Sequence, residues 1–180
     1  MQDDMNSETE TLSKNVYDLL QDRLYIIFRD FDNICVSFSG GKDSGLLLNL
    51  CIDYIRKHQL KRKICVFHLD YEIQYTMTLD YVNRMIASNQ DILEWYRICV
   101  PFRVTTSTSM HQSYWRPWDE KMKDLWVRPM PKGVWTKEHF PFYTEKLWDY
   151  EFQMLFAQWL HERKDPVRTC FLIGIRTQES

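Results

Sequence analysis

Residues 37–45, with the sequence SFSGGKDSG, have the types and spacing best suited to chemistry in this chain. They follow an apolar run at 34–36, typical of a buried strand, and precede a leucine-rich helical pattern. Glycines let backbone N–H groups approach an oxyanion, and free N–H groups at a helix start point toward one. Lys42 adds a positive charge and the serines add hydroxyl donors. We interpret this stretch as a phosphate-binding loop, with a surface turn as the alternative.

The glycine spacing distinguishes this loop from two common phosphate-binding motifs. The ATPase loop requires a glycine where Val36 stands, and a hydroxyl residue where Asp43 stands. The dinucleotide fingerprint fails because Gly40, Gly41 and Gly45 have the wrong spacing. The pattern that remains is Ser-Gly-Gly-Lys-Asp-Ser at 39–44.

Length and composition favour one globular domain. The 180 residues are 44% hydrophobic, which is enough for a core and excludes a disordered chain. The formal charge of −2 gives no global attraction to nucleic acid or to an anionic membrane. No apolar run reaches membrane length, and the acidic N-terminus lacks the basic start of a signal peptide. We expect a cytoplasmic protein.

The cysteines favour a structural role. None of the five forms a Cys-x-x-Cys pair, and four lie inside apolar patterns, which is typical of buried, reduced thiols. The histidines show no metal-ligand spacing. We expect no iron–sulfur cluster and no protein-bound transition metal. The cysteines are Cys35, Cys51, Cys65, Cys99 and Cys170.

The spacing of apolar residues predicts an α/β fold with a mostly parallel sheet. Continuous apolar runs predict strands at 33–38, 63–69, 95–100 and 169–173. Recurrence every three or four residues predicts helices at 13–31, 43–55, 77–86 and 152–160. Strands that alternate with helices pair in parallel through right-handed crossovers. Ser13 or Asn15 is the expected cap of the first helix.

Ligands of such sheets bind beyond the carboxyl ends of the strands, and three features fall there. The first is the 37–45 loop. The second is Asp70, which could hold Mg²⁺ or accept a hydrogen bond from a ribose hydroxyl. The alternative is an acidic side chain in a solvated turn, and this is the interpretation that we favour for Glu72. The third is Gly174-x-Arg176, where glycine permits close approach and arginine offers a planar fork for phosphate or sulfate.

The stretch 101–148 breaks the regular pattern and is predicted to be an aromatic-rich insertion or cap. It holds five of the seven tryptophans, five of the six prolines and several interleaved cations. One interpretation is that the tryptophans pack an irregular subdomain. The other is a lid over the nucleotide whose cations reach a second anionic group, with Arg128 as the candidate.

The motifs resemble a known family. SGGKDS at 39–44 and G-x-R-x-x-E-S at 174–180 are similar to the PP-loop (ATP pyrophosphatase) superfamily, in its phosphoadenosine phosphosulfate (PAPS) reductase branch. Stretches at 67–72, 112–119 and 126–131 resemble the subgroup called immunoglobulin-binding regulator A. Its relatives include the sulfur-transfer component of DNA phosphorothioation systems. The resemblance covers nearly the whole chain.

This resemblance implies an adenine nucleotide α-hydrolase-like three-layer sandwich and a role in sulfur metabolism or nucleotide-dependent modification. It places adenine against the end of the second strand, near Phe67, His68 and Leu69, and makes a ParB-like protein partner an expectation. The branch has an acid at this strand end, usually followed by Thr, where this chain has Tyr71. It also carries a nucleophilic Glu-Cys-Gly segment that this chain lacks, so we expect no PAPS reduction by this chain alone.

We therefore expect an enzyme that binds ATP, or a PAPS-like nucleotide, with Mg²⁺ and acts at the α-phosphate with pyrophosphate release. The catalytic candidates are Lys42 for the leaving charge, Asp70 for the metal and Arg176 for an anionic group. The alternative is an inactive nucleotide sensor or partner-binding regulator. A helix ought to follow Ser180, so we expect a longer natural protein. The expected nucleotide-binding residues are Ser37, Ser39, Gly40, Gly41, Lys42, Asp43, Ser44, Phe67, His68, Leu69, Gly174 and Arg176.

Overall fold

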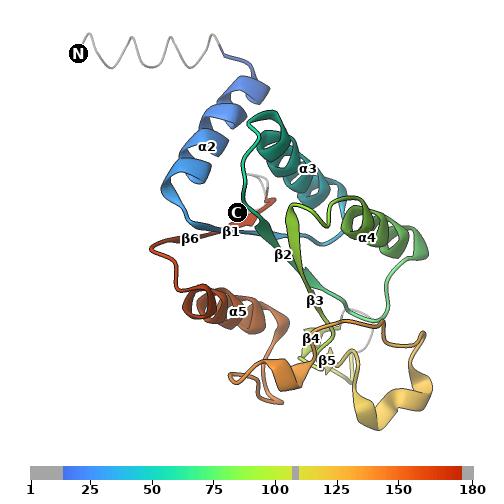
Figure 1. Cartoon of the computed structure of the whole chain (residues 1–180). Coiled ribbons are helices and arrows are strands. Elements are labelled where there is room, and N and C mark those ends of the chain that lie inside the picture. Colours follow the sequence, from blue (N-terminus) through green and yellow to red (C-terminus); the bar gives the residue numbers. More distant parts are fainter. Residues whose placement is uncertain (1–13, 107–109, 176–180) are drawn as a thin grey trace.

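A parallel four-stranded sheet forms the centre of the protein in the computed structural model, which describes residues 14–106 and 110–175 (Figure 1). The strand order is β3-β2-β1-β6, and all three pairings are parallel. The predicted α/β fold is therefore confirmed. The strands are β1 (Asn33–Ser37), β2 (Ile64–Leu69), β3 (Leu93–Ile98) and β6 (Thr169–Ile173).

Helices cover both faces of the sheet and give the expected three layers (Figure 1). The first three helices pack on one face around Leu24, Leu48 and Val82, and the last helix packs on the other around Phe156. None of the described helices is long and apolar enough to cross a lipid bilayer. The helices are α2 (Val16–Asp30), α3 (Lys42–Lys57), α4 (Thr76–Ser88) and α5 (Asp149–Lys164).

Local sequence signals account for most element boundaries. The side chain of Asn15 accepts a hydrogen bond from the Asp18 amide at 3.0 Å and caps α2, as predicted. The last strand occupies the predicted 169–173. The third strand lies two residues earlier than expected, because the amide of Cys99 donates to Trp135 in the insertion rather than to the sheet.

The order of the strands places the 37–45 loop at a topological switch point. From β1 the chain moves to β2 on one side, and β6 returns to the other side of β1. Crossovers that leave β1 on opposite sides open a crevice at its carboxyl end. The loop, the end of β2 and the end of β6 thus share one edge of the sheet.

The insertion between β3 and α5 contains little regular structure. Its strands β4 (Val104–Thr105) and β5 (Tyr114–Trp115) form a two-stranded antiparallel sheet. Two 3₁₀ helices follow, η1 (Glu120–Leu125) and η2 (Lys137–His139). Trp135 exchanges backbone hydrogen bonds of 2.8 Å with Arg97 and Cys99, so the insertion also extends the edge of the main sheet.

Candidate functional site

The loop between β1 and α3 is held in shape by its own serines and glycines. Gly40 has a φ of +83°, and a Cβ there would lie 2.6 Å from Cγ2 of Thr78, so only glycine fits. The hydroxyls of Ser39 and Ser44 lie 2.9 Å apart. They also accept hydrogen bonds of 3.2 Å from the Gly41 and Ser39 amides, respectively. The two serines we expected to donate to phosphate therefore stabilise the loop.

Other donors of the loop have no partner within the described residues. The amides of Gly40, Lys42 and Ser44 donate to no described acceptor, and the exposed ammonium of Lys42 forms no ion pair there. The three amides lie in the loop or first turn of α3, a sixteen-residue helix whose dipole favours an anion at this end. Donors of this kind can receive an anion, so the loop is a candidate anion-binding site.

The end of β6 lies against the start of α3, next to the loop. A Cβ on Gly174 would lie 3.1 Å from the backbone C and O atoms of Asp43 and 3.2 Å from the Ser44 nitrogen. Gly174 is thus a glycine because it packs directly on the first turn of α3. The structure brings these two predicted motifs together, whereas Arg176 lies outside the described residues.

A cavity of about 140 Å³ opens beside the loop. Four of its lining residues were predicted from the sequence to bind the nucleotide. They are Ser37 and Ser39, at the end of β1, and Phe67 and Leu69, in β2. Gln74 and Gln153 were not predicted, because nothing in their local sequence marks them. The lining residues are Ser37, Phe38, Ser39, Phe67, Leu69, Tyr71, Gln74 and Gln153.

His68, predicted to contact adenine, does not line this cavity. Adjacent strand residues point to opposite faces, so His68 faces away from the side on which Phe67 packs. Its Nδ1 donates to the carbonyl oxygen of Phe38 at 2.7 Å, which leaves Nε2 as a buried acceptor without a described partner. Burial lowers the pKa of His68 and keeps the imidazole neutral.

Asp70 is fully buried and paired on both oxygens. One oxygen accepts from Arg97 at 2.9 Å, and the other accepts from Arg128 and from the amide of Glu72. Mg²⁺ could bind this carboxylate only after these contacts opened. No group of three metal-ligating side chains occurs within the described residues. The magnesium assignment stays a prediction.

Glu72 is not the solvated turn acid that we favoured from the sequence. It is 5% exposed, and its two carboxylate oxygens accept the backbone amides of Trp118 and Val127, each at 3.0 Å. The contacts connect positions 46 and 55 residues apart, so local sequence could not reveal them. Asp70 and Glu72 together anchor the insertion to the end of β2.

Arg128 takes part in this anchor rather than pointing to a ligand. Its guanidinium pairs with Asp70, donates to the carbonyl of Glu72 at 2.9 Å and packs 4.9 Å from the Trp118 ring centroid. The indole of Trp118 donates to the Asp70 carbonyl at 2.6 Å. The second anionic group that we expected Arg128 to reach is therefore Asp70, within the protein.

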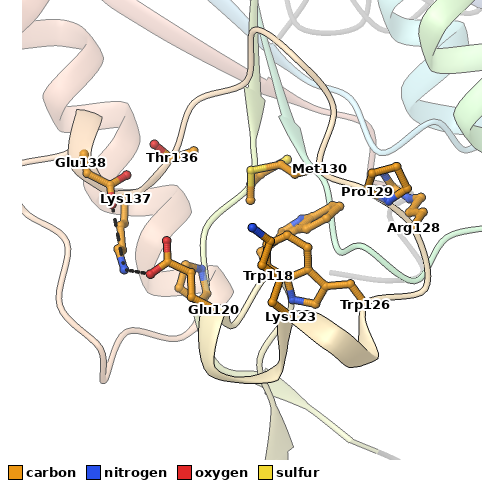
Figure 2. A pocket seen from close by; sticks show the side chains of 12 residues that line it. Trp118, Glu120, Lys123, Trp126, Arg128, Pro129, Met130, Thr136, Lys137 and Glu138 are labelled. Carbon is orange, nitrogen blue, oxygen red and sulfur yellow. Dashed lines mark hydrogen bonds and ion pairs between the residues drawn. The ribbon is translucent and has the colours of Figure 1, made fainter.

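A cavity of about 660 Å³, larger than the one beside the loop, is lined mostly by residues of the insertion. Figure 2 shows Trp118 and Trp126 beside Lys123 and Met130, with Lys137 paired to Glu120 at 3.0 Å. This cavity in the insertion shares no lining residue with the cavity beside the loop. Size alone therefore does not identify the site in this molecule.

The cysteines are free, and four are buried, as predicted. Desolvation raises the pKa of Cys51 and of Cys65 to about 12, and it also raises the pKa of Cys35. Cys99 lines the large cavity, but burial raises its pKa as well. A thiol held protonated in this way is a poor nucleophile.

Comparison with known proteins gives one informative match. The chain is 33% identical over 171 residues to the "Uncharacterized protein YbdN" of Escherichia coli K12. The match covers 94% of this chain and 40% of the relative, so the chain spans less than half the length of that protein. No family model matches. The chain is thus a homologue of YbdN with a parallel α/β fold.

Proposed function

We propose that this chain binds ATP, or a PAPS-like adenylyl nucleotide, with its phosphates on residues 39–44 and its base in the adjacent cavity. The observation that carries the proposal is that the amides of Gly40, Lys42 and Ser44 have no acceptor among the described residues and lie near a cavity at the switch point. Within the described residues, none of these amides has to give up a hydrogen bond to receive a phosphate.

We further propose that the chemistry occurs at the α-phosphate. With ATP, an acceptor forms a bond to that phosphorus while the bond to the bridging oxygen breaks, and pyrophosphate leaves with the electron pair. Lys42 and the loop amides would stabilise the charge that develops on the leaving group. The described residues offer Mg²⁺ no ready ligand set, so a metal would arrive with the nucleotide's own phosphates and water.

Calorimetric titration with ATP, PAPS and adenosine phosphosulfate tests the binding. Each charge-assisted contact is worth about 1.5–3 kcal/mol, so Lys42→Ala should weaken binding about tenfold or more. Lys57→Ala is the matched control, because Lys57 is exposed at the opposite end of the same helix. Absence of binding by all three nucleotides, or equal affinity of the two variants, would contradict the proposal.

A second candidate is a nucleotide sensor that regulates a partner, such as the ParB-like protein that the family resemblance implies. The double pairing of Asp70 favours it, because that carboxylate has no free oxygen for catalysis. Pyrophosphate release from ATP, with and without the partner, separates the candidates. Binding without release under both conditions would favour the sensor. Sulfite production with thioredoxin should be absent, given the buried thiols.

A further inference from the structure

The cavity in the insertion has the size of a ligand site, and the proposed nucleotide binding does not use it (Figure 2). It measures about 660 Å³, and sites for small molecules usually measure about 300–1,000 Å³. Its walls come from the residues that follow β3, from residues 118–130 and from residues 136–138. None of residues 37–45 lines it, so it is separate from the proposed phosphate site.

One side of this cavity is aromatic and apolar. The rings of Trp118 and Trp126 meet edge to face, with centroids 5.2 Å apart and planes at 86°. Trp118 is buried behind the partly exposed Trp126, and Met130 and Pro129 extend the apolar surface. Apolar surface of this kind gains free energy when an apolar group of a ligand covers it.

Most charged side chains that line the cavity are paired within the described part of the chain. Lys137 lies 3.0 Å from the carboxylate of Glu120 and 3.9 Å from that of Glu138. Arg128 pairs with Asp70. These four lining residues are therefore occupied by protein contacts before any ligand arrives.

Lys123 is the exception among the charged residues of this cavity. Its ammonium forms no ion pair and no hydrogen bond with a described residue, and it lies 5.8 Å from the centroid of the Trp126 ring. Figure 2 shows its side chain on the same side of the cavity as the tryptophans, opposite Lys137 and Glu138. A cation without a counter-ion beside an apolar wall can be neutralised by an anionic group of a ligand.

The surrounding charges restrict the kind of ligand. Arg128 lies 4.9 Å from the centroid of the Trp118 ring, and Lys123 lies over Trp126, so a cationic ligand would meet like charge at both rings. The two carboxylates on the other side of the cavity repel a phosphate dianion more strongly than a monoanion. A ligand with one negative charge fits both constraints.

We infer that the cavity in the insertion binds a small apolar carboxylic acid in its ionised form. The carboxylate pairs with Lys123, and the apolar body lies against Trp126 and Met130. This inference goes beyond the proposed function and is independent of it, because no residue of the proposed phosphate site takes part.

Three naphthalene compounds of nearly the same shape test the charge that the cavity selects. Calorimetric titration compares 2-naphthoate, the neutral 2-naphthamide and the cationic 2-naphthylmethylamine. The carboxylate should bind about fivefold more tightly than the amide, a modest factor because Lys123 is exposed and water screens its charge. The amine should bind most weakly. Equal affinities of the carboxylate and the amide, or tightest binding of the amine, would overturn the inference.

Replacement of Lys123 tests which residue makes this selection. Lys123→Met keeps an unbranched apolar side chain and removes the ammonium, so it should bind 2-naphthoate about fivefold more weakly and 2-naphthamide as before. Lys121→Met is the matched control, because Lys121 is an exposed lysine of the same helix η1 that does not line the cavity. An unchanged preference for the carboxylate in Lys123→Met would contradict the inference.

NMR of the indole N–H groups locates the bound compound. The Trp126 resonance should shift on addition of 2-naphthoate, whereas that of Trp159, which lies on α5 and does not line the cavity, should not. The reverse pattern, or no binding of any of the three compounds, would show that the inference is wrong. ATP binding is measured separately, so either result leaves the proposed function standing. Binding of 2-naphthoate without binding of any nucleotide would refute the proposed function alone.

Discussion

The loop after β1 and the acidic cluster after β2 lie at the same edge of the sheet but differ in how their polar groups are satisfied. Lys42 and the amides of Gly40 and Ser44 have no described partners. Asp70 and Glu72 are buried, and all their carboxylate oxygens accept hydrogen bonds from the protein. Unsatisfied groups can receive a ligand, whereas satisfied groups hold the fold together. The comparison supports the proposed binding at the loop and assigns positioning of the insertion to the cluster.

Removal of the buried carboxylate should give the largest effect on stability. Asp70→Ala leaves Arg97 and Arg128 without their shared partner, and breaking such a pair costs about 3–5 kcal/mol. Urea unfolding measures the change. Asp53→Ala on α3 is the control, because Asp53 is exposed. A loss as small as that of the control would mean that the cluster does not stabilise the fold.

Glu72→Ala should loosen the insertion with little effect on the loop. The buried amide of Trp118 loses its acceptor, at about 1–3 kcal/mol, and the part-buried amide of Val127 loses its acceptor at a smaller cost. Hydrogen exchange should therefore accelerate at these two amides, while affinity for ATP changes less than in Lys42→Ala. If Glu72→Ala instead abolished ATP binding, the division between the two regions would be wrong.

Two glycines with positive φ provide a matched test of the loop. Left-handed backbone costs a non-glycine residue about 1–2 kcal/mol, and both Gly40 (φ +83°) and Gly133 (φ +70°) adopt it. A Cβ on Gly40 would also strike Thr78, whereas one on Gly133 would meet no atom within 4 Å. Gly40→Ala should therefore lower the Tm more than Gly133→Ala and also weaken ATP binding. Equal losses would show that the loop tolerates the added methyl group.

Protonation of His68 should have the smallest effect on stability, seen as a change in the pH dependence of the free energy of unfolding. Burial lowers its pKa below the ordinary value of 6.5, so the unfolded chain binds the proton more readily than the folded protein. Its contribution to stability should be complete above about pH 6.5 and fall as the pH drops toward the folded pKa. Urea unfolding from pH 7.5 to 5 should show a shallower pH dependence in His68→Gln. An unchanged dependence would mean that His68 titrates normally.

The sequence predicted the elements well because their signals are local. Apolar runs and helical spacing located the four described α-helices and the four strands of the main sheet, and the glycine pattern located the loop. The sequence also placed Gly174 at the carboxyl end of the last strand, and the structure brings it to the loop because β1 and β6 are neighbours. These inferences needed only periodicity and topology.

The roles of the polar residues were harder to predict because they depend on distant partners. Glu72 was expected in solvent, and its burial is explained only by amides in the insertion. Arg128 was expected at a ligand and instead pairs with Asp70, 58 residues away. For His68, the alternation of strand side chains was a usable signal, since Phe67 and His68 cannot face the same cavity.

A titration of ¹⁵N-labelled protein with ATP, followed by NMR, tests the central claim most directly. The account predicts that the amide resonances of Gly40, Lys42 and Ser44 shift on addition of ATP. Those of Trp118 and Val127, already bonded to Glu72, should stay in place. Shifts confined to the Glu72 cluster, or no shift at the loop at saturating ATP, would contradict it.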